Sequence, residues 1–489
     1  MIQYVFKYIH NELLPMHASH TLIPVTTQEL HTVLNTQTQA YYTQGIPSLE
    51  QRLSNLDTLF DILKNNQQAI AQAISNDFGH RAHQETQLAE LFLCLDGIRY
   101  VRKRLKKWMR PQQRSVSIWL LGSSNTVIPQ PLGVVGIVVP WNYPLFLCIS
   151  PLICALAAGN RCMIKMAANS SGLSHLLHTL FAEKFPQEML TIVQGAKGSD
   201  FSSLPFDHLI FTGSSNTGRQ VMRAAADNLT PVTLELGGKS PTIIAPDYSI
   251  AKAAKRLLFA KFLNAGQTCV APDYVFVPEG KVDEFITAAK AIVAERYPNI
   301  ENKDYTSIID DTAYLRLKGT LAEALGQGAI ATTLVPNSIA NDITRKFPPT
   351  LLTGVTDTMR VMQEEIFGPI LPIMTYHHID QVLEYIHHRD RPLALYLFSD
   401  DKKTQEKVIR KTRSGGVCMN DTALHVGQHD MPFGGVGESG MGQYHGVEGF
   451  LTMSKLRPIF KQARYPSLSL MYPPYGKTFD KIIKIMLRL

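Results

Sequence analysis

Residues 133–140 read G-V-V-G-I-V-V-P, a continuous apolar run that marks a change of composition along the chain. A run with no polar face predicts a strand that is buried on both sides, as in the middle of a parallel sheet. Strands that alternate with helices after such a run predict a doubly wound α/β domain. The expected strands are residues 161–165, 191–193 and 208–211, and the expected helices are residues 149–159, 173–185 and 216–226.

Helical patterns precede this domain. Leucines recur on one side of residues 38–76, and a second long helix is expected from about His83 to Met109. Residues 1–27 show no clear period and are expected to form an N-terminal arm. Residues 115–129 read as two short strands around Gly122, which predicts a hairpin that serves either an oligomer contact or the edge of a sheet.

A second, smaller α/β unit is expected up to about residue 397, and a separate helix at the C-terminus. The expected elements of the unit are the helix 282–294 and the strands 275–277, 329–330, 359–362 and 371–376. The last residues, 479–489, read F-D-K-I-I-K-I-M-L-R-L. This pattern predicts a basic amphipathic helix that lies either on a partner subunit or on a membrane surface.

The composition is that of a soluble globular protein with more than one domain. The chain has 489 residues, of which 45% are hydrophobic and 18% charged. Its net charge of +7 comes from scattered basic residues, and the cluster at residues 102–107 reads as a solvated helix face, so no nucleic-acid partner is expected. Six cysteines without a C-x-x-C pair, and no signal peptide or apolar span, predict a reducing, cytoplasmic location.

One cysteine has the surroundings of a nucleophile. Residues 262–274 read F-L-N-A-G-Q-T-C-V-A-P-D-Y, with Cys269 on a tight loop between the helix expected at residues 250–263 and the strand 275–277. Backbone amides on such a loop can point at one spot, so the thiol could attack a carbonyl and the amides could hold the resulting oxyanion. From the loop alone, a buried cysteine that acts as a small hydrophobe is an equally good interpretation.

Two further motifs suit a catalytic site. Glu235 lies in the apolar run V-T-L-E-L-G-G at residues 232–238, where burial should raise the pKa of a general base, although a paired structural carboxylate fits as well. Residues 211–219 read F-T-G-S-S-N-T-G-R and place a helix N-terminus after a strand, where dinucleotide phosphates bind. The spacing is not G-x-G-x-x-G, so an ordinary strand-to-helix turn is the alternative.

Other motifs are rejected on their spacing. Residues 238–240 read G-K-S, but Thr233 stands where a P-loop needs its first glycine. The glycine-rich stretch 433–442 does not match G-x-S-x-G of a hydrolase. The histidine pairs at residues 377–378 and 387–388 lack partners at metal-ligand spacing, so no metal site is expected.

Six motifs together resemble the aldehyde dehydrogenase superfamily. They occur in the order of that family: P-W-N-Y-P (140–144), F-T-G-S-S-N-T-G (211–218), L-E-L-G-G-K-S-P (234–241), N-A-G-Q-T-C (264–269), E-E-I-F-G-P (364–369) and P-F-G-G-V-G-E-S-G-M-G (432–442). Four more resemble its coniferyl aldehyde dehydrogenase branch, near the dimeric fatty and aromatic aldehyde dehydrogenases: N-D-F-G-H-R (76–81), Q-T-C-V-A-P-D-Y (267–274), M-G-Q-Y-H-G (441–446) and Y-P-P-Y-G-K (472–477).

The resemblance implies an architecture and an assembly. It implies a Rossmann-type NAD(P)-binding domain over residues 28–235, with a bridging hairpin at about 115–130, and a second α/β catalytic domain over residues 236–425. Residues 426–489 then return to the small β bridging element and end in the C-terminal tail. A homodimer is the implied assembly.

The resemblance also implies the chemistry. Cys269 is the implied nucleophile, Glu235 the base that activates water, and Asn142 an oxyanion donor together with the Cys269 backbone N–H. The reaction is the NAD- or NADP-dependent oxidation of an aromatic or medium-to-long-chain aliphatic aldehyde to the acid, through a thiohemiacetal and a thioester. The implied cofactor contacts are Trp141, Lys165, Gly213, Ser214, Gly218, Leu236, Glu365 and Phe367.

One position departs from the family. The family commonly has Lys-Pro-Ser-Glu where this chain has Lys165-Met166-Ala167-Ala168, so Ala168 replaces a glutamate that resembles the ligand of the ribose 2′-hydroxyl. We expect the enzyme to accept NADP at least as readily as relatives that keep the glutamate. Three alternatives remain at this stage: an acylating enzyme, which would not need Glu235, an enzyme specific for a semialdehyde, and a non-catalytic binding protein.

Overall fold

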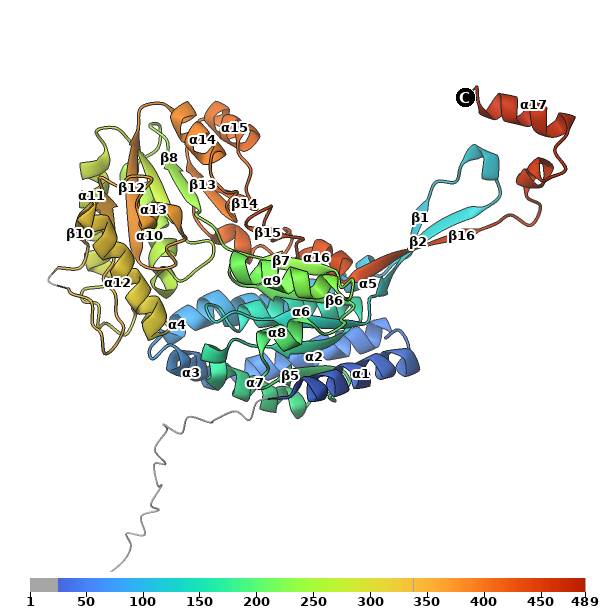
Figure 1. Cartoon of the computed structure of the whole chain (residues 1–489), viewed down its shortest axis with the longest axis horizontal. Helices are drawn as coiled ribbons and strands as arrows, with labels where there is room; N and C mark the ends of the chain where they lie inside the picture. The colour runs from blue at the N-terminus through green and yellow to red at the C-terminus, as the bar shows by residue number, and fades with distance from the viewer. Residues whose placement is uncertain (1–24, 337, 489) are drawn as a thin grey trace, which may run out of the picture.

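The structure is a computed structural model that describes residues 25–336 and 338–488. Most of the predicted N-terminal arm, residues 1–24, lies outside the described residues. Figure 1 shows two lobes, each built on its own sheet, and an arm of strands that projects away from them. Within the described part of the chain no helix is long and apolar enough to cross a membrane.

A six-stranded sheet lies at the centre of the first lobe. Its order is β15(Gly440–Met441), β7(Val232–Glu235), β6(His208–Thr212), β3(Val134–Val138), β4(Arg161–Lys165) and β5(Leu190–Val193). All neighbours are parallel except β15, which pairs antiparallel with β7. The apolar run at residues 133–140 therefore supplies a central strand, as predicted, and four of its five residues in β3 are buried.

Helices cover both faces of this sheet. One face packs on α1(Thr27–Gln44), α8(Gly198–Ser202) and α9(Ser215–Ala226). The other packs on α2(Leu49–Asn65), α3(Gln67–Asp77), α5(Leu93–Trp108), α6(Phe146–Ala158) and α7(Ser171–Ala182). Neighbouring residues of β4 show the division, because Met163 joins the first cluster while Cys162 and Ile164 join the second. The predicted doubly wound domain is confirmed.

The N-terminal helices are more broken than the sequence pattern predicted. Residues 38–76 belong to α1, α2 and α3 rather than to one helical run. Gly45 ends α1 with φ 71°, and Ser48 then caps α2 by accepting a hydrogen bond from the Gln51 amide. The second predicted helix is found, but α4(His83–Thr86) and α5 are joined by a π-helical segment, η1(Gln87–Phe92).

A seven-stranded sheet builds the second lobe. Its order is β10(Ile330–Thr333), β11(Thr350–Thr353), β12(Ile370–Tyr376), β9(Tyr274–Pro278), β8(Pro241–Ile244), β13(Ala394–Phe398) and β14(Gly416–Met419). Only the β10–β11 pair is antiparallel. The unit therefore extends past residue 397, because β14 completes the sheet. Its helices are α10(Ile250–Phe262), α11(Val282–Arg296), α12(Asp311–Gly326), α14(Ile379–His387) and α15(Lys402–Lys411).

Two predicted strands are wrong. Residues 360–363 form one helical turn, α13(Arg360–Gln363), which buries Val361 and Met362. A short apolar run cannot distinguish a buried strand from a buried helical turn, and this one was too short to show its period. Residues 118–120 form a 3₁₀ turn, and the first strand of the hairpin is β1(Gln112–Arg114) instead.

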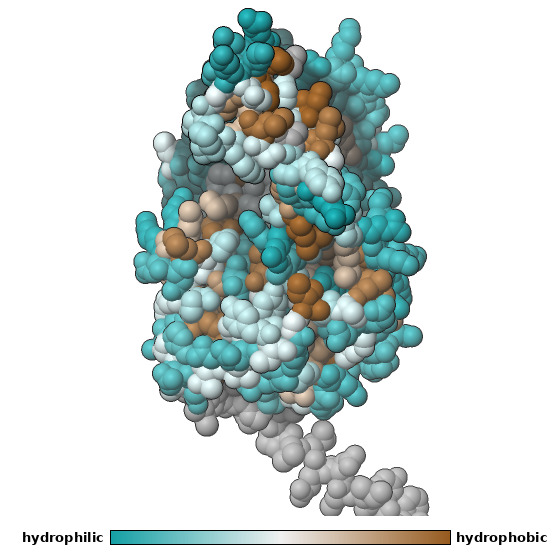
Figure 2. Space-filling model, turned by 90° about the vertical axis from the view of Figure 1, so that its right-hand side faces the viewer, coloured by the Kyte–Doolittle hydropathy of each residue, from teal (hydrophilic) through white to brown (hydrophobic). Residues whose placement is uncertain are grey.

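The arm is a three-stranded antiparallel ribbon. It consists of β1, β2(Ser124–Pro131) and β16(Ser454–Lys461), so the C-terminal part of the chain pairs with the predicted hairpin. The helix α16(Gly446–Thr452) precedes β16, and α17(Lys477–Met486) follows it beyond the tip of the ribbon (Figure 1). Viewed along the arm, apolar side chains gather in the upper part of the molecule among hydrophilic ones (Figure 2).

The chain passes from the six-stranded to the seven-stranded sheet at residues 235–241 and returns at residues 419–440. These positions are close to the predicted domain boundaries, which remain a prediction.

Candidate active site

Cys269 lies on a loop between the two lobes. The loop starts where α10 ends in a 3₁₀ turn, η4(Leu263–Gly266), and finishes where β9 begins. Asn264 and Ala265 both adopt left-handed backbone angles, with φ 53° and 50°, and Gly266 follows with φ 78°. Three such residues in a row reverse the chain sharply. A side chain at Gly266 would collide with the Gly368 carbonyl, so the loop and the 364–369 segment approach each other through this glycine.

Two cavities meet at Cys269. One, of about 280 Å³, is lined by Pro140, Trp141, Asn142, Thr212, Gly213, Ser214, Glu235, Leu236, Gly237, Cys269, Ala313, Arg316, Glu365 and Phe367. The other, of about 320 Å³, reaches Cys269 from a different set of elements, among them η1, α10 and the 422–433 loop. The half-buried thiol is thus open to both spaces.

Glu235 shares the first cavity with the thiol. It is the last residue of β7, and only 1% of it is exposed. Burial raises its pKa to about 7, and the nearby Cys269 thiol and Thr212 hydroxyl oppose the rise. Within the described chain neither carboxylate oxygen has a hydrogen-bond partner of good geometry. An unpaired carboxylate that ionises near neutral pH is suited to general base catalysis.

The thiol itself is held neutral by its surroundings. Burial raises the pKa of Cys269 well above its usual value, and the charges of Glu235 and Glu365 raise it further. A thiolate therefore forms at this site only if a neighbouring group accepts the proton. Glu235 lies against the thiol and has a raised pKa of its own, so it is placed for that task.

Asn142 lines the same cavity as this pair and lies in the turn between β3 and α6. The residue is 3% exposed, and its backbone carbonyl accepts hydrogen bonds from Arg81 at 3.2 Å and from the Asn264 side chain at 3.0 Å. Its side chain lines the 280 Å³ cavity, and among the described residues nothing accepts a hydrogen bond from its amide. The amide is therefore free to donate to a group in that cavity.

The first cavity has the features of a dinucleotide site. Gly213 and Ser214 lead from β6 into the twelve-residue helix α9, where Ser214 is the N-cap. Glu365 faces the cavity with a buried, unpartnered Oε1, and burial together with Asp273 raises its pKa to about 8. A side chain at Gly237 would collide with that carboxylate, so the backbone here must stay bare. These features fit a nicotinamide dinucleotide, with Glu365 facing ribose hydroxyls and the helix N-terminus facing phosphates.

Most of the predicted site residues come together here. Cys269, Glu235, Asn142, Trp141, Gly213, Ser214, Leu236, Glu365 and Phe367 all line this cavity. Two predicted cofactor contacts do not line it: Lys165, which ends β4 and donates to the Met166 carbonyl at 3.2 Å, and Gly218, which packs inside α9 against Leu236. Sequence reasoning missed Thr212, Gly237 and Arg316. Thr212 and Gly237 lie within the motifs at residues 211–218 and 234–241, whereas no local pattern pointed to Arg316.

The second cavity is an apolar tunnel. Its lining is Leu88, Ala89, Phe92, Leu93, Tyr143, Phe146, Leu147, Phe259, Ala260, Leu263, Thr268, Cys269, Val270, Thr422, Ala423, Leu424, Val426, Gly427, Gln428 and Phe433. None of these described residues carries a charged side chain. The hydroxyls of Tyr143 and Thr268 bond to each other at 2.9 Å, beside the thiol. Leu88, Phe92 and Leu424 are each 53% exposed, which gives the mouth an apolar rim.

Among the residues that the structure describes, no cluster of three histidines, cysteines or acidic residues could hold a metal ion. The groups that line the first cavity include the Cys269 thiol, the Glu235 carboxylate of raised pKa and the free Asn142 amide. These three groups converge between an apolar tunnel and a cavity suited to a dinucleotide.

Comparison with known proteins agrees with this geometry. A sequence model of the aldehyde dehydrogenase family matches residues 25–459. The chain is 51% identical to a probable coniferyl aldehyde dehydrogenase of Pseudomonas aeruginosa, over 93% of this chain and 95% of that protein. It is 36% identical to the substrate-bound AldH of Staphylococcus aureus, with a TM-score of 0.87 over 94% of this chain and 99% of that one. A Mycobacterium tuberculosis aldehyde dehydrogenase complexed with NAD⁺ is 26% identical, with a TM-score of 0.81 over 90% and 92% of the two chains.

Proposed function

The chain belongs to the aldehyde dehydrogenase family and oxidises aldehydes with NAD or NADP, and from this we propose that its substrates are uncharged aromatic or medium-to-long-chain aliphatic aldehydes, such as coniferyl aldehyde. The observation that carries the proposal is the position of Cys269. The thiol lies where an apolar tunnel without charged lining residues meets the cavity suited to the cofactor. A semialdehyde with a carboxylate would meet no cation in this tunnel, so that alternative is disfavoured.

The first half of the reaction uses three groups of this chain. Glu235 accepts the thiol proton, and the Cys269 sulfur adds to the aldehyde carbon to form a thiohemiacetal. The Asn142 amide and the Cys269 backbone N–H donate to the oxyanion, and each such donor contributes about 3–4 kcal/mol to the transition state. When bound, the nicotinamide cofactor supplies the hydride acceptor that the oxidation requires.

The second half needs water and a base. After oxidation the carbonyl carbon is bound to Cys269 as a thioester. Glu235 first releases the thiol proton to solvent, which a pKa near 7 allows. It then takes a proton from the water that attacks this carbon, and it returns that proton to the sulfur as the acid leaves. An enzyme that only acylates a second substrate would not need a base for water in this second half, so a base of this pKa beside the thiol favours hydrolysis.

The experiment that tests this function follows reduced cofactor by its absorbance. Coniferyl aldehyde, benzaldehyde, hexanal and decanal are each supplied with NAD and with NADP, and the products are identified as acids. We expect turnover with uncharged aldehydes and none in Cys269→Ala. Turnover confined to a carboxylate-bearing semialdehyde, or turnover that survives in Cys269→Ala, would contradict the proposal.

We further propose that the enzyme uses NADP at least as readily as relatives with a glutamate at this position. Ala168 begins a short turn, η3(Ala168–Ser170), three residues after Lys165 at the end of β4. A glutamate here would repel a 2′-phosphate, whereas alanine leaves Lys165 as the charged neighbour. Ala168→Glu should therefore shift the ratio of kcat/KM values toward NAD. A ratio of kcat/KM values that strongly favours NAD and is unchanged in Ala168→Glu would contradict this proposal.

We propose that the ribbon and α17 join two copies of this chain in a homodimer. Leu456, Ile459 and Phe460 on β16 are each more than 40% exposed, and α17 has no buried residue among those described. Phe460→Asp should lower the mass seen by light scattering. The alternative occupant of α17 is a membrane surface, so the full chain and a chain without residues 477–489 are also tested for binding to anionic liposomes. Binding that is lost with α17 would favour the membrane.

A cytoplasmic location is also proposed. All six cysteines are unpaired, and four of them are buried. Buried thiols with no partner suit a reducing compartment. Fractionation of cells with an antibody to the chain tests this location, and recovery outside the cytoplasm would contradict it.

A further inference from the structure

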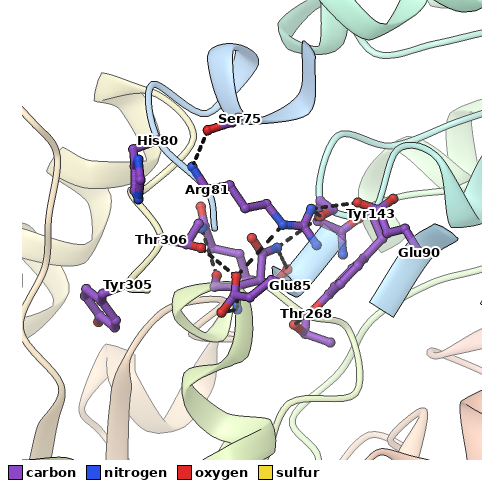
Figure 3. A network of polar contacts seen from close by, with 12 residues as sticks. Ser75, His80, Arg81, Glu85, Glu90, Tyr143, Thr268, Tyr305 and Thr306 are labelled. Atoms are coloured by element: carbon purple, nitrogen blue, oxygen red, sulfur yellow. Dashed lines mark hydrogen bonds and ion pairs between the residues drawn. The ribbon is translucent and has the colours of Figure 1, made fainter. Parts of the chain in front are cut away.

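A buried ionic cluster lies behind the active site, outside both cavities. Arg81 follows α3, Glu85 lies in α4 and Glu90 in η1, so all three come from one short stretch of chain. Arg81 and Glu90 have fully buried side chains, and the Glu85 side chain is 10% exposed. The Arg81 guanidinium lies 2.8 Å from Glu90 Oε1 and 3.9 Å from Glu85 Oε2 (Figure 3). None of the three lines a cavity that reaches Cys269.

This cluster holds the Asn142 turn from both sides. Arg81 donates to the Asn142 carbonyl at 3.2 Å. Glu90 Oε2 accepts from the backbone amides of Leu145 and Phe146, at 2.8 and 3.0 Å, where α6 begins. The backbone that carries the Asn142 side chain is therefore fixed by two buried side chains, Arg81 and Glu90.

The same cluster holds the turn that carries the nucleophile. The Glu85 carboxylate accepts hydrogen bonds from the backbone N–H of Asn264 at 3.2 Å and from the Thr306 hydroxyl at 2.6 Å. Asn264 is the first of the left-handed residues before Cys269, and its side chain donates both to the Asn142 carbonyl at 3.0 Å and to the Gln267 carbonyl at 3.1 Å. One side chain thus joins the two halves of the site, and Glu85 orders the backbone that presents it.

Stability alone does not explain such a cluster. A buried arginine with two buried carboxylates is expensive to desolvate, and well-packed apolar residues of similar size often give equal or greater stability. The bonds of the cluster are directed instead at the two segments that would present the oxyanion donors. Because such donors act only in the right geometry, an error of about 1 Å can reduce a rate about 100-fold.

We propose that Arg81 and Glu85 are positioning residues that fix the Asn142 amide and the Cys269 backbone N–H relative to each other. The proposal rests on the oxyanion role given to these two donors above. Arg81 fixes the position of the Asn142 turn through the Asn142 carbonyl. Glu85 fixes the backbone at Asn264, in the turn that precedes Cys269. Neither residue touches substrate or cofactor.

The test is a double-mutant cycle of Glu85→Gln and Asn142→Ala. We expect Glu85→Gln to lower kcat for aldehydes about 10- to 100-fold, with the Kd for NAD and the KM for aldehyde nearly unchanged. In the Asn142→Ala background the same change should lower kcat by less than about threefold, because the amide relative to which Glu85 fixes the Cys269 backbone N–H is already absent. A merely structural role would give equal losses in both backgrounds, and that result would overturn the proposal.

A matched control is Asp77→Asn. Asp77 is a partly buried carboxylate that accepts hydrogen bonds from two backbone amides, those of Gly172 and Leu173 at 2.8 and 3.0 Å. Its bonds lead to α7 and not to Asn142 or Asn264. Its kcat should match that of the wild type. If Glu85→Gln does not fold, Thr306→Val removes the hydroxyl donor to Glu85 while keeping the shape. Thr306→Val should lower kcat severalfold in the otherwise wild-type enzyme and much less in the Asn142→Ala background. Equal falls in kcat in the two backgrounds would overturn the proposal.

A cofactor-free reaction separates this proposal from the proposed function. An activated aryl ester can acylate Cys269 through an oxyanion without any hydride transfer, so its hydrolysis uses the same donors. We expect Glu85→Gln to slow ester hydrolysis in parallel with aldehyde oxidation. If the wild type oxidises none of the aldehydes but its ester hydrolysis is still slowed by Glu85→Gln, the proposed substrates are wrong and the positioning role stands. Unchanged ester hydrolysis in a folded Glu85→Gln enzyme would overturn the positioning role.

Discussion

The replacement Glu235→Gln should make the folded enzyme more stable while it disables turnover. Glu235 is buried at the end of β7, and neither of its oxygens has a hydrogen-bond partner of good geometry in the described chain. Burial raises its pKa from 4.5 to about 7, so the folded protein favours the protonated form. Above about pH 7 the carboxylate is charged in the folded and in the unfolded chain, and only the folded chain bears the loss of hydration.

The magnitude follows from the pKa. Each tenfold change in proton affinity corresponds to about 1.4 kcal/mol, so a rise from 4.5 to about 7 implies a cost of about 3 kcal/mol to folding at pH 8. The cost shrinks as the pH falls from about 7 and vanishes below about 4.5, where both states bind the proton. For 489 residues the unfolding entropy is about 1 kcal/mol per degree, so the expected gain in Tm at pH 8 is about 3 °C.

The assay compares the Tm of the wild type and Glu235→Gln at about pH 8 and about pH 5, at one protein concentration and without cofactor. Glu438→Gln is the control, because Glu438 pairs with Arg391 at 3.1 Å and its pKa is lowered by that arginine. That change should give no gain in Tm. The gain in Glu235→Gln should be present at pH 8 and mostly absent at pH 5.

A Tm of Glu235→Gln that equals the wild-type Tm at both pH values would refute the reasoning. It would mean that the carboxylate is solvated or paired in the folded protein, and a pKa near 7 would then have no physical basis. A gain of the same size at both pH values would point to packing of the amide rather than to removal of a buried charge.

Three further predictions concern the reaction. Turnover of the wild type should fall about tenfold for each pH unit below about 7, as Glu235 protonates, and a profile without a bend between about pH 6 and 8 would contradict this. Asn142→Ala should lower kcat/KM about 100- to 1,000-fold in stopped-flow assays while the Kd for NAD stays constant, and a loss below threefold would exclude the oxyanion role. Gly237→Ala should weaken NAD binding in a fluorescence titration, because its methyl group would displace the Glu365 carboxylate; an unchanged Kd would show that this carboxylate does not contact the cofactor.

The sequence predicted the parts of the fold that depend on local pattern. The strand expected at residues 161–165 is β4 with the same bounds, because an apolar run between turns leaves little choice. The hairpin was right in kind, but its first strand was placed on the apolar residues 118–120, whereas the pairing with β2 uses the polar residues 112–114. Strand pairing on an exposed ribbon depends on register more than on hydrophobicity. The apolar composition of residues 118–120 therefore led to a wrong position for the first strand.

The site could be predicted only as far as motifs reach. Cys269, Glu235 and Asn142 each lie in a recognisable motif, and the structure brings them to one cavity. Arg81 and Glu85 were not predicted as part of the site, because their partners are 61 and 179 residues away along the chain. No local pattern can show that a charge in a helix will bond the backbone of a loop so distant in sequence.

The electrostatics of the site explain how a cysteine can remain unreactive until it is needed. Cys269 has two carboxylates as neighbours, Glu235 and Glu365, and all three groups have raised pKa values. The only basic side chain that lines either cavity in the described chain is Arg316, which already donates to the Ile366 carbonyl at 2.7 Å. The resting thiol is therefore protonated, and in the proposed mechanism the sulfur becomes nucleophilic only as its proton passes to Glu235. In the same proposed mechanism Glu235 later releases that proton and takes another from water, and a pKa near 7 would allow one carboxylate to do both.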